Sequence, residues 1–188
     1  MRMEWIVGAV VGAIVVYAIA IYNRLVRQRN LVREGWSGID VQLKRRTELV
    51  PNLVETVKAY AAHERGLFEE VAARRASSIA AHEVKEQAAA ERALQGSLGK
   101  LMAVAEAYPE LKANQNFLKL QDQLAEIEDQ LQMARRYYNG TVRNLNISIQ
   151  SVPDVLVARP LGFREQPFFD LDEGEAAAPT VAFPERAS

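Results

Sequence analysis

The stretch NQNFLKLQDQLAEIEDQLQMARRYYN, residues 114–139, decides the fold of this chain. Its apolar residues recur at alternating steps of three and four: Phe117, Leu120, Leu124, Ile127, Leu131, Ala134 and Tyr138. This spacing is an unbroken a/d heptad seam, which places the apolar side chains on one face of a long helix. Asn114 is a suitable N-cap, so we expect a helix from Gln115 to Gln150. The Gln, Glu and Asp side chains then face solvent or a partner.

A second apolar stripe lies upstream, with the same steps: Trp36, Ile39, Leu43, Val50, Leu53, Val57 and Tyr60. A strict heptad continued from Ile39 would put Arg46 on this stripe. Either the stripe shifts there, or Arg46 pairs with a carboxylate across a bundle. Pro51 removes one helical hydrogen bond. We expect a kink near Thr47 to Pro51 without a stop, because the stripe resumes at once.

The region between these stripes is also helical in pattern, with apolar steps at Leu94, Leu98, Leu101, Ala105 and Tyr108. Ser77 and Ser78 indicate a break, and Pro109 ends an element because the residue before a proline avoids the α region. Gly96 and Gly99 indicate close helix packing. The fold class that follows is all-α, an antiparallel bundle of long helices over residues 24–150, preceded by an N-terminal transmembrane helix.

Residues 1–23 form the anchor of this prediction. The segment WIVGAVVGAIVVYAIAIY, from Trp5 to Tyr22, contains no charged residue. Its eighteen residues give roughly 27 Å of helix, close to the ~30 Å hydrocarbon core of a bilayer. Trp5 and Tyr22 lie at its ends, where amphipathic rings prefer the membrane interface. Gly8 and Gly12 form a G-x-x-x-G spacing that allows two such helices to approach, and a helix that does not dimerise is equally compatible with it.

The orientation of this single span follows from its flanks. Arginines are concentrated immediately after it, at Arg24, Arg27, Arg29 and Arg33, whereas Arg2 on the other side is accompanied by Glu4. The positive-inside rule therefore predicts an external N-terminus and a cytoplasmic bundle at the cell membrane. A cleaved signal peptide is the rival interpretation, because Ala18 and Ala20 form a small-x-small pattern.

The last part of the chain, residues 151–188, differs from the rest because five of the seven prolines lie there. It also holds apolar islands, including Phe168 and Phe169. We expect this tail to lie back along the bundle as far as about Phe169. The acidic and Ala-rich sequence from about residue 170 predicts disorder.

No pattern in the chain indicates a reaction. Cys is absent, which excludes thiolate chemistry, and the net charge of −1 argues against a nucleic-acid binder. His63 and His82 each precede a glutamate, but the H-E-x-x-H spacing of zinc hydrolases is missing. Glu64, Glu126, Glu128 and Asp129 are carboxylates of the kind that solvated helix faces carry. We therefore predict no catalytic residue, metal or cofactor, and a chain that is not an enzyme.

The residues selected as a candidate protein-interaction face are Arg45, Arg46, Arg135, Arg136, Tyr137 and Asn139. Clusters of arginine and tyrosine are enriched where proteins bind one another. The alternative interpretation of this cluster is that its arginines are solvated and lie beside a tyrosine of the core. The expected partners are the lipid bilayer and a protein that the sequence does not identify.

Three segments give the chain a resemblance to the LemA family: YNRLVRQRN, GIDVQLKRRTELVPNLVETVKAYAAHE and FLKLQDQLAEIEDQLQMARRYYNGTVRNLN. The family pattern usually repeats an aromatic–Asn pair; here Tyr138–Asn139 is present, and the later pair reads Leu145–Asn146. The tail usually reads F-P-x-N-I-V-A; here Val152 and Asp154 stand at the Phe and Asn places. The resemblance implies a membrane anchor with an external N-terminus and a cytoplasmic antiparallel bundle, and it implies no reaction.

The function expected from these observations is a membrane-anchored interaction or scaffolding module at the inner face of the cell membrane. Two alternatives remain open at this point. One is a structural or assembly protein of the envelope, with the bundle outside the membrane. The other is an enzyme whose site the sequence does not reveal.

Overall fold

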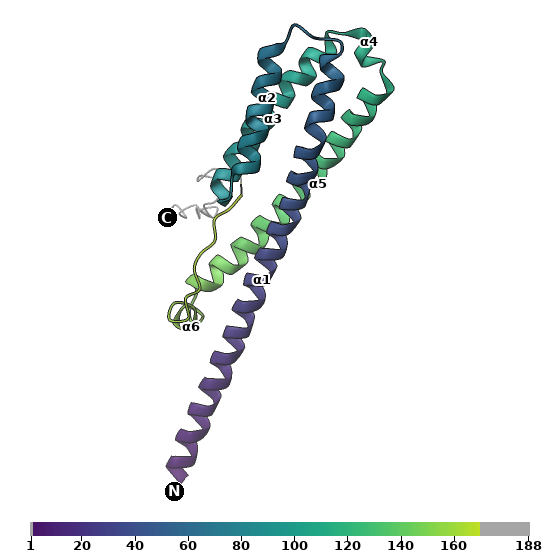
Figure 1. The fold of residues 1–188 in the computed structure, drawn as a ribbon. Helices are drawn as coiled ribbons and strands as arrows, with labels where there is room; N and C mark the ends of the chain where they lie inside the picture. Colours follow the sequence, from purple (N-terminus) through teal and green to yellow (C-terminus); the bar gives the residue numbers. More distant parts are fainter. Residues whose placement is uncertain (1, 170–188) are drawn as a thin grey trace, which may run out of the picture.

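The structure is a computed structural model, and it describes residues 2–169 (Figure 1). The regular elements of this range are helices: α1 (Arg2–Lys58), α2 (Arg65–Ala80), α3 (Val84–Glu106), α4 (Pro109–Lys112), α5 (Gln115–Gln150) and α6 (Val155–Ala158). The long helices run in alternating directions and form an antiparallel bundle. The all-α prediction is therefore confirmed. The predicted disorder of the sequence from residue 170 lies outside the described residues.

Helix α1 joins the apolar N-terminal segment to the bundle without interruption. It is 57 residues long and continues through Pro51, so the proline does not stop it. No described side chain before Ile21 is buried, and this part of α1 projects beyond the other helices (Figure 1). The expected boundary between residues 23 and 24 is thus not a structural break, because one helix crosses it.

The connections refine the sequence prediction. Helix α2 runs through Ser77 and Ser78 and ends at Ala80, so the break predicted at the serines is displaced. Helix α3 ends at Glu106 before Pro109. Asn114 caps α5 as predicted, since its side-chain oxygen accepts hydrogen bonds from the backbone N–H groups of residues 116 and 117, at 2.8 and 3.1 Å.

Two apolar clusters fill the protein. The lower cluster, toward the N-terminus of α1 in Figure 1, comprises Ile21, Leu25, Val32, Ile39, Leu43, Ala88, Leu131, Tyr138, Val142, Leu145, Ile149, Ala158, Phe163 and Phe169. The upper cluster comprises Val50, Leu53, Val57, Ala61, Phe68, Val71, Leu94, Leu98, Leu101, Ala105, Leu111, Phe117 and Leu124. The predicted seams of α1 and α5 contribute to both clusters.

The tail folds back along the bundle, as the sequence predicts. After α5 the chain forms a hook, residues 151–162, which contains α6 and ends at Gly162. Gly162 has a φ of 74°, a left-handed conformation that glycine adopts without strain. Residues 163–169, here called the strap, then run beside α1 and α5 and contribute two phenylalanines to the lower cluster. The strap thus supplies apolar cover where only two long helices meet.

Candidate functional site

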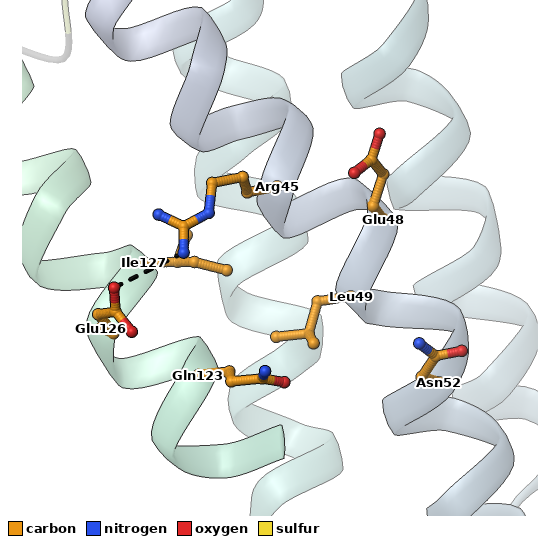
Figure 2. A pocket seen from close by; sticks show the side chains of 7 residues that line it. All are labelled: Arg45, Glu48, Leu49, Asn52, Gln123, Glu126 and Ile127. Carbon is orange, nitrogen blue, oxygen red and sulfur yellow. Dashed lines mark ion pairs between the residues drawn. The ribbon is translucent and has the colours of Figure 1, made fainter. Parts of the chain in front are cut away.

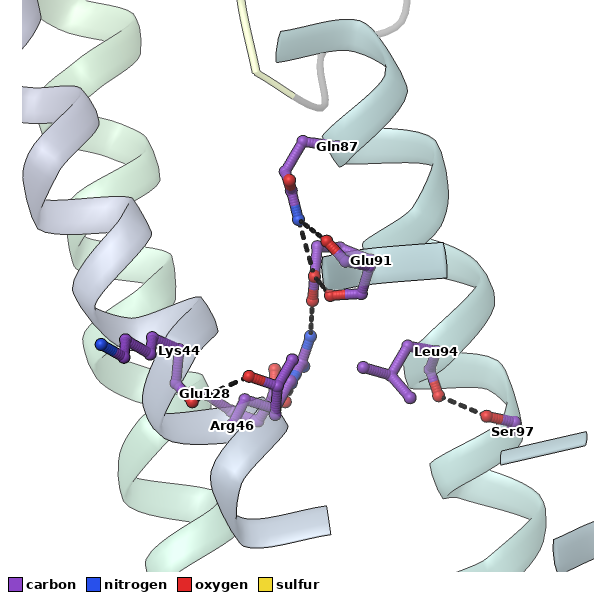
Figure 3. A network of polar contacts seen from close by, with 9 residues as sticks. Lys44, Arg46, Gln87, Glu91, Leu94, Ser97 and Glu128 are labelled. Atoms are coloured by element: carbon purple, nitrogen blue, oxygen red, sulfur yellow. Dashed lines mark hydrogen bonds and ion pairs between the residues drawn. The ribbon is translucent and has the colours of Figure 1, made fainter. Parts of the chain in front are cut away.

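Arg46 is fully buried, and on α1 it lies between Leu43 of the lower cluster and Val50 of the upper cluster. Figure 3 shows the polar contacts around it. Its Nη1 donates a hydrogen bond to Glu91 Oε2 on α3 at 2.9 Å, and its Nη2 pairs with the carboxylate of Glu128 on α5. Of the two alternatives that the sequence left for Arg46, pairing across the bundle is the correct one. The heptad does place this arginine on the apolar stripe, and two carboxylates compensate its charge there.

Polar side chains from α2 and α3 complete this buried network. Ser78 Oγ donates to Glu91 Oε1, and Gln87 Nε2 donates to the same oxygen at 3.0 Å and to the Ser78 carbonyl at 3.1 Å. All four long helices therefore meet in one polar layer, defined by Arg46, Ser78, Gln87, Glu91 and Glu128. Neither Arg46 nor Glu91 has exposed surface. The layer fixes how the helices pack.

The charge on Arg46 survives its burial. Desolvation lowers the pKa of the Arg46 guanidinium, while the hydrogen bond and the charge of Glu91 raise it; the nearby Arg135 charge lowers it further. Arginine nevertheless stays protonated in proteins. A buried ion pair of this kind is costly to break, because removing one partner leaves the other charge buried and uncompensated.

Two asparagines of α5 hold the strap. Asn139 Nδ2 donates to the Phe169 carbonyl and its Oδ1 accepts from the Phe169 N–H, both at 2.9 Å. Seven residues on, Asn146 makes the same two bonds, also at 2.9 Å, to Gln166. A helix has no free backbone groups in its interior with which to bind an extended segment. The two amides act in their place and form an amide ladder.

Aromatic contacts surround this ladder. Trp36 packs against Tyr138 and Phe169, with ring centroids 5.6 and 5.9 Å apart. Tyr138 donates its hydroxyl hydrogen to the Pro167 carbonyl at 2.9 Å. Burial raises the pKa of Tyr138 to about 12. The guanidinium of Arg135 lies 5.1 Å from the centre of the Phe169 ring, in a cation–π contact.

The outer face of α1 and α5 carries a shallow cavity of about 350 Å³ (Figure 2). Arg45 and Glu126 face each other across it at 3.6 Å. The other lining residues are Glu48, Leu49, Asn52, Gln123 and Ile127. Both charge signs and apolar carbon are present, so this surface suits a polypeptide better than a small ion.

The structure separates the residues that the sequence grouped as an interaction face. Arg45, Arg136 and Tyr137 are exposed, whereas Arg46 is buried and so is not part of any surface. Asn139 binds the protein's own strap. The predicted face is wrong for one physical reason. Adjacent side chains on a helix point about 100° apart, so residues that are neighbours in sequence lie in different environments.

Sequence reasoning missed Glu91 and Asn146. Glu91 is a single acid within an Ala-rich helix, and nothing in that pattern distinguishes it from a solvated residue. Asn146 did carry a signal, because it follows Asn139 by seven residues and therefore shares its helix face. Gly96 and Gly99 were expected to mark close packing, but an added Cβ at either one meets nothing within 4 Å.

The described residues hold no preformed metal centre: within 2–169, no three His, Cys, Asp or Glu side chains are grouped to bind an ion. His63 lies in the α1–α2 connection and His82 in the α2–α3 connection. By length and composition, one helix in the described range, α1, is able to cross a membrane.

The LemA family profile matches residues 35–183 of the chain. Curated relatives include the magnetosome protein MamQ of Magnetospirillum gryphiswaldense and the proteins MamQ 1 and MamQ 2 of Paramagnetospirillum magneticum. Each is 25% identical to this chain over 174 aligned positions, which cover 79% of the chain and 64% of the relative. The chain therefore spans slightly less than two thirds of the length of these relatives.

Proposed function

The chain belongs to the LemA family, and we propose that it is a membrane-anchored helical bundle that binds a protein partner at the cytoplasmic face of the cell membrane. The observation that carries the proposal is the outer face of α1 and α5, which exposes apolar side chains on a helix that continues into the membrane anchor. The names of the MamQ relatives state no reaction, and the proposed function assigns no catalytic residue.

The anchor is the exposed part of α1. Trp5 is 81% exposed, and the apolar residues that follow it are exposed as far as residue 20, except for the half-buried Ala18. Apolar carbon of this extent is unfavourable in water and favourable in a bilayer. Because the same helix enters the bundle without a break, the bundle is held close to the membrane. The four arginines that follow the span favour an anchor over a cleaved signal, because cations directly after an apolar segment resist translocation. Self-association through Gly8 and Gly12 stays a prediction.

The orientation rests on the arginines that follow the span, since cations near a membrane helix favour the cytoplasmic side. Reporter domains fused after Ser188, one active only in the cytoplasm and one active only outside it, test this. We expect signal from the cytoplasmic reporter alone. Signal from the external reporter would overturn the orientation and favour an assembly role in the envelope.

The proposed partner-binding surface lies along the edge where α1 and α5 pack against each other. A Cβ added at Gly38 would lie 3.9 Å from Ala134, and Arg45 pairs with Glu126 along the same edge. The exposed large apolar residues of α1 and α5 include Val41 at 51%, Met133 at 47% and Tyr137 at 46%. Tyrosine and methionine are enriched where proteins bind each other. Together with the Arg45–Glu126 cavity, these residues form a surface of mixed charge around apolar carbon.

Photocrosslinking in cells tests this surface. Tyr137 is replaced by a photoreactive phenylalanine analogue, and the matched control carries the analogue at Ile79, an exposed apolar residue of α2. We expect a discrete protein adduct from position 137 and none from position 79. Adding Val41→Ser and Met133→Ser should reduce the adduct several-fold. Equal adducts at both positions, or an adduct that these changes leave unaltered, would contradict the proposal.

A further inference from the structure

We propose that the hook, residues 151–162, is a second membrane contact, which binds the headgroup layer of a bilayer that contains anionic phospholipid. The inference goes beyond partner binding but rests on the membrane anchor. It is carried by three independent features of the hook: its position along α1, its exposed apolar residues and the positive charge around it.

The first feature is position. Tyr22, the last residue of the apolar span, packs edge-on against Phe163 directly after the hook, with ring centroids 5.9 Å apart. Two residues on, Arg24 pairs with Asp154 inside the hook. Arg29 lies 5.1 Å from the centre of the Phe163 ring. The hook is therefore fixed beside residues 22–29 of α1, where the span ends.

The depth of a bilayer places this part of α1 among the headgroups. Hydrocarbon occupies ~30 Å of a total of ~40–45 Å, which leaves roughly 5–8 Å of headgroup layer on each side. At ~1.5 Å per residue, that layer covers about three to five residues of helix after Tyr22. Arg24 lies within this range, so the hook that it holds lies at the same level.

The second feature is exposed apolar carbon. Val152 is 80% exposed, Leu156 is 71% exposed and Leu161 is 56% exposed. Within the described residues that follow the apolar span, no other large apolar side chain is as exposed as these three. A short element that presents several exposed apolar residues gains free energy by inserting them into the interfacial region of a bilayer.

The third feature is charge. Across residues 22–33 and 151–165 there are six arginines and two carboxylates: Arg24, Arg27, Arg29, Arg33, Arg159 and Arg164, with Asp154 and Glu165. Asp154 is buried against Arg24, which leaves the excess positive. Arg24 and Arg27 also line a cavity of about 430 Å³ between α1 and α5, with Leu31 and Ile147. Cations beside apolar carbon complement an anionic headgroup and the start of its acyl chains.

A fluorescence experiment on the full chain tests the contact. The chain has no cysteine, so Leu156→Cys takes a single environment-sensitive dye. The matched control is Leu118→Cys, an exposed apolar position at the start of α5, at the opposite end of the bundle. Both proteins are reconstituted in vesicles of phosphatidylcholine alone and of equal parts phosphatidylcholine and phosphatidylglycerol. Lipids that carry a spin label near the headgroup serve as quenchers.

We expect a blue shift and spin-label quenching at position 156 but not at 118, several-fold stronger with phosphatidylglycerol. Arg159→Gln should lower the ratio of docked to free hook by about five-fold in the anionic vesicles, the effect of ~1 kcal/mol per arginine. This change touches only an exposed arginine, so the bundle stays folded.

Each contrary outcome overturns a different part of the proposal. Absence of quenching at 156, in protein that floats with the vesicles, overturns the hook contact and leaves the anchor intact. Equal quenching in both vesicle types overturns the preference for anionic lipid. A blue shift without quenching shows that protein covers the hook and overturns the lipid assignment. Protein that does not float overturns the anchor, and the hook contact with it.

Discussion

The lower and upper parts of the protein bury similar sets of apolar residues by different means. The upper cluster draws its residues mainly from the four long helices, and aliphatic residues predominate in it. The lower cluster lies mainly between α1 and α5 and is closed by the strap, with Tyr138, Phe163 and Phe169 as large aromatic members. Two helices alone expose part of their shared seam, so the lower part needs a third element.

The difference shows how an extended segment takes the place of a helix. Helices pack through side chains, because their backbone groups are bonded internally. An extended strap brings unpaired N–H and C=O groups into a half-buried position, and these groups need partners. Asn139 and Asn146 provide them through the amide ladder. The Arg46 layer lies between the two parts and ties all four long helices together.

The largest expected effect comes from breaking the layer between the two parts. Arg46→Met removes the cation and leaves the buried Glu91 without its charge partner. The free energy of unfolding should fall by about 3–5 kcal/mol, the usual cost of such a change. Urea unfolding of the full chain in detergent micelles, followed by circular dichroism, measures it.

The control for this prediction removes both charges. Arg46→Met combined with Glu91→Gln leaves no uncompensated buried ion, so most of the lost stability should return. The remaining carboxylate, that of Glu128, is partly exposed and can be hydrated. If the single change costs less than about 1 kcal/mol, the buried pairing does not hold the helices together.

A second change should break only the lower part. Asn139→Ala together with Asn146→Ala leaves the backbone groups of Gln166 and Phe169 without partners, at about 1–3 kcal/mol for each amide lost. We expect the strap to detach. Hydrogen exchange should then accelerate at these two strap amides while the amides of the upper helices keep their protection. Asn144→Ala, an exposed asparagine of the same helix, should change neither.

The amide ladder also shows how far sequence reasoning reaches. Local signals predicted the bundle, the cap at Asn114 and the path of the tail: heptad spacing, a capping residue type and apolar islands among prolines. The pairing of Arg46 was predicted as one of two alternatives. Its partner Glu91 could not be identified, since which carboxylate faces an arginine depends on how the helices pack. The same limit hid the role of Asn139, whose partner lies thirty positions away.

The strap makes the lower part sensitive to alkaline pH. An unfolded tyrosine loses its proton near pH 10, whereas the pKa of Tyr138 is raised to about 12 in the folded protein. Between these values the unfolded state binds fewer protons, so stability falls as pH rises, by about 1.4 kcal/mol per unit. Stability from this group is complete below about pH 10 and is lost by about pH 12.

Tyr138→Phe isolates this effect. At neutral pH it loses only the hydrogen bond to the Pro167 carbonyl, about 1 kcal/mol. Between about pH 9 and pH 11 its urea midpoint should fall less than that of the unchanged protein. Parallel midpoints for the two proteins would mean that the Tyr138 hydroxyl titrates as if it were in water.

The last comparison concerns two glycines on one edge of α1. A Cβ at Gly35 would lie 3.0 Å from the backbone Cα of Tyr138, so Gly35→Ala must push α5 away and should cost about 1–2 kcal/mol. A Cβ at Gly38 would lie at an ordinary 3.9 Å from Ala134, so Gly38→Ala should gain up to ~1 kcal/mol of helix propensity. Gly99→Ala, in open space on α3, should gain as much. The urea midpoint should therefore fall for Gly35→Ala and rise for Gly38→Ala and Gly99→Ala. A stabilising Gly35→Ala would show that α1 and α5 do not pack this closely.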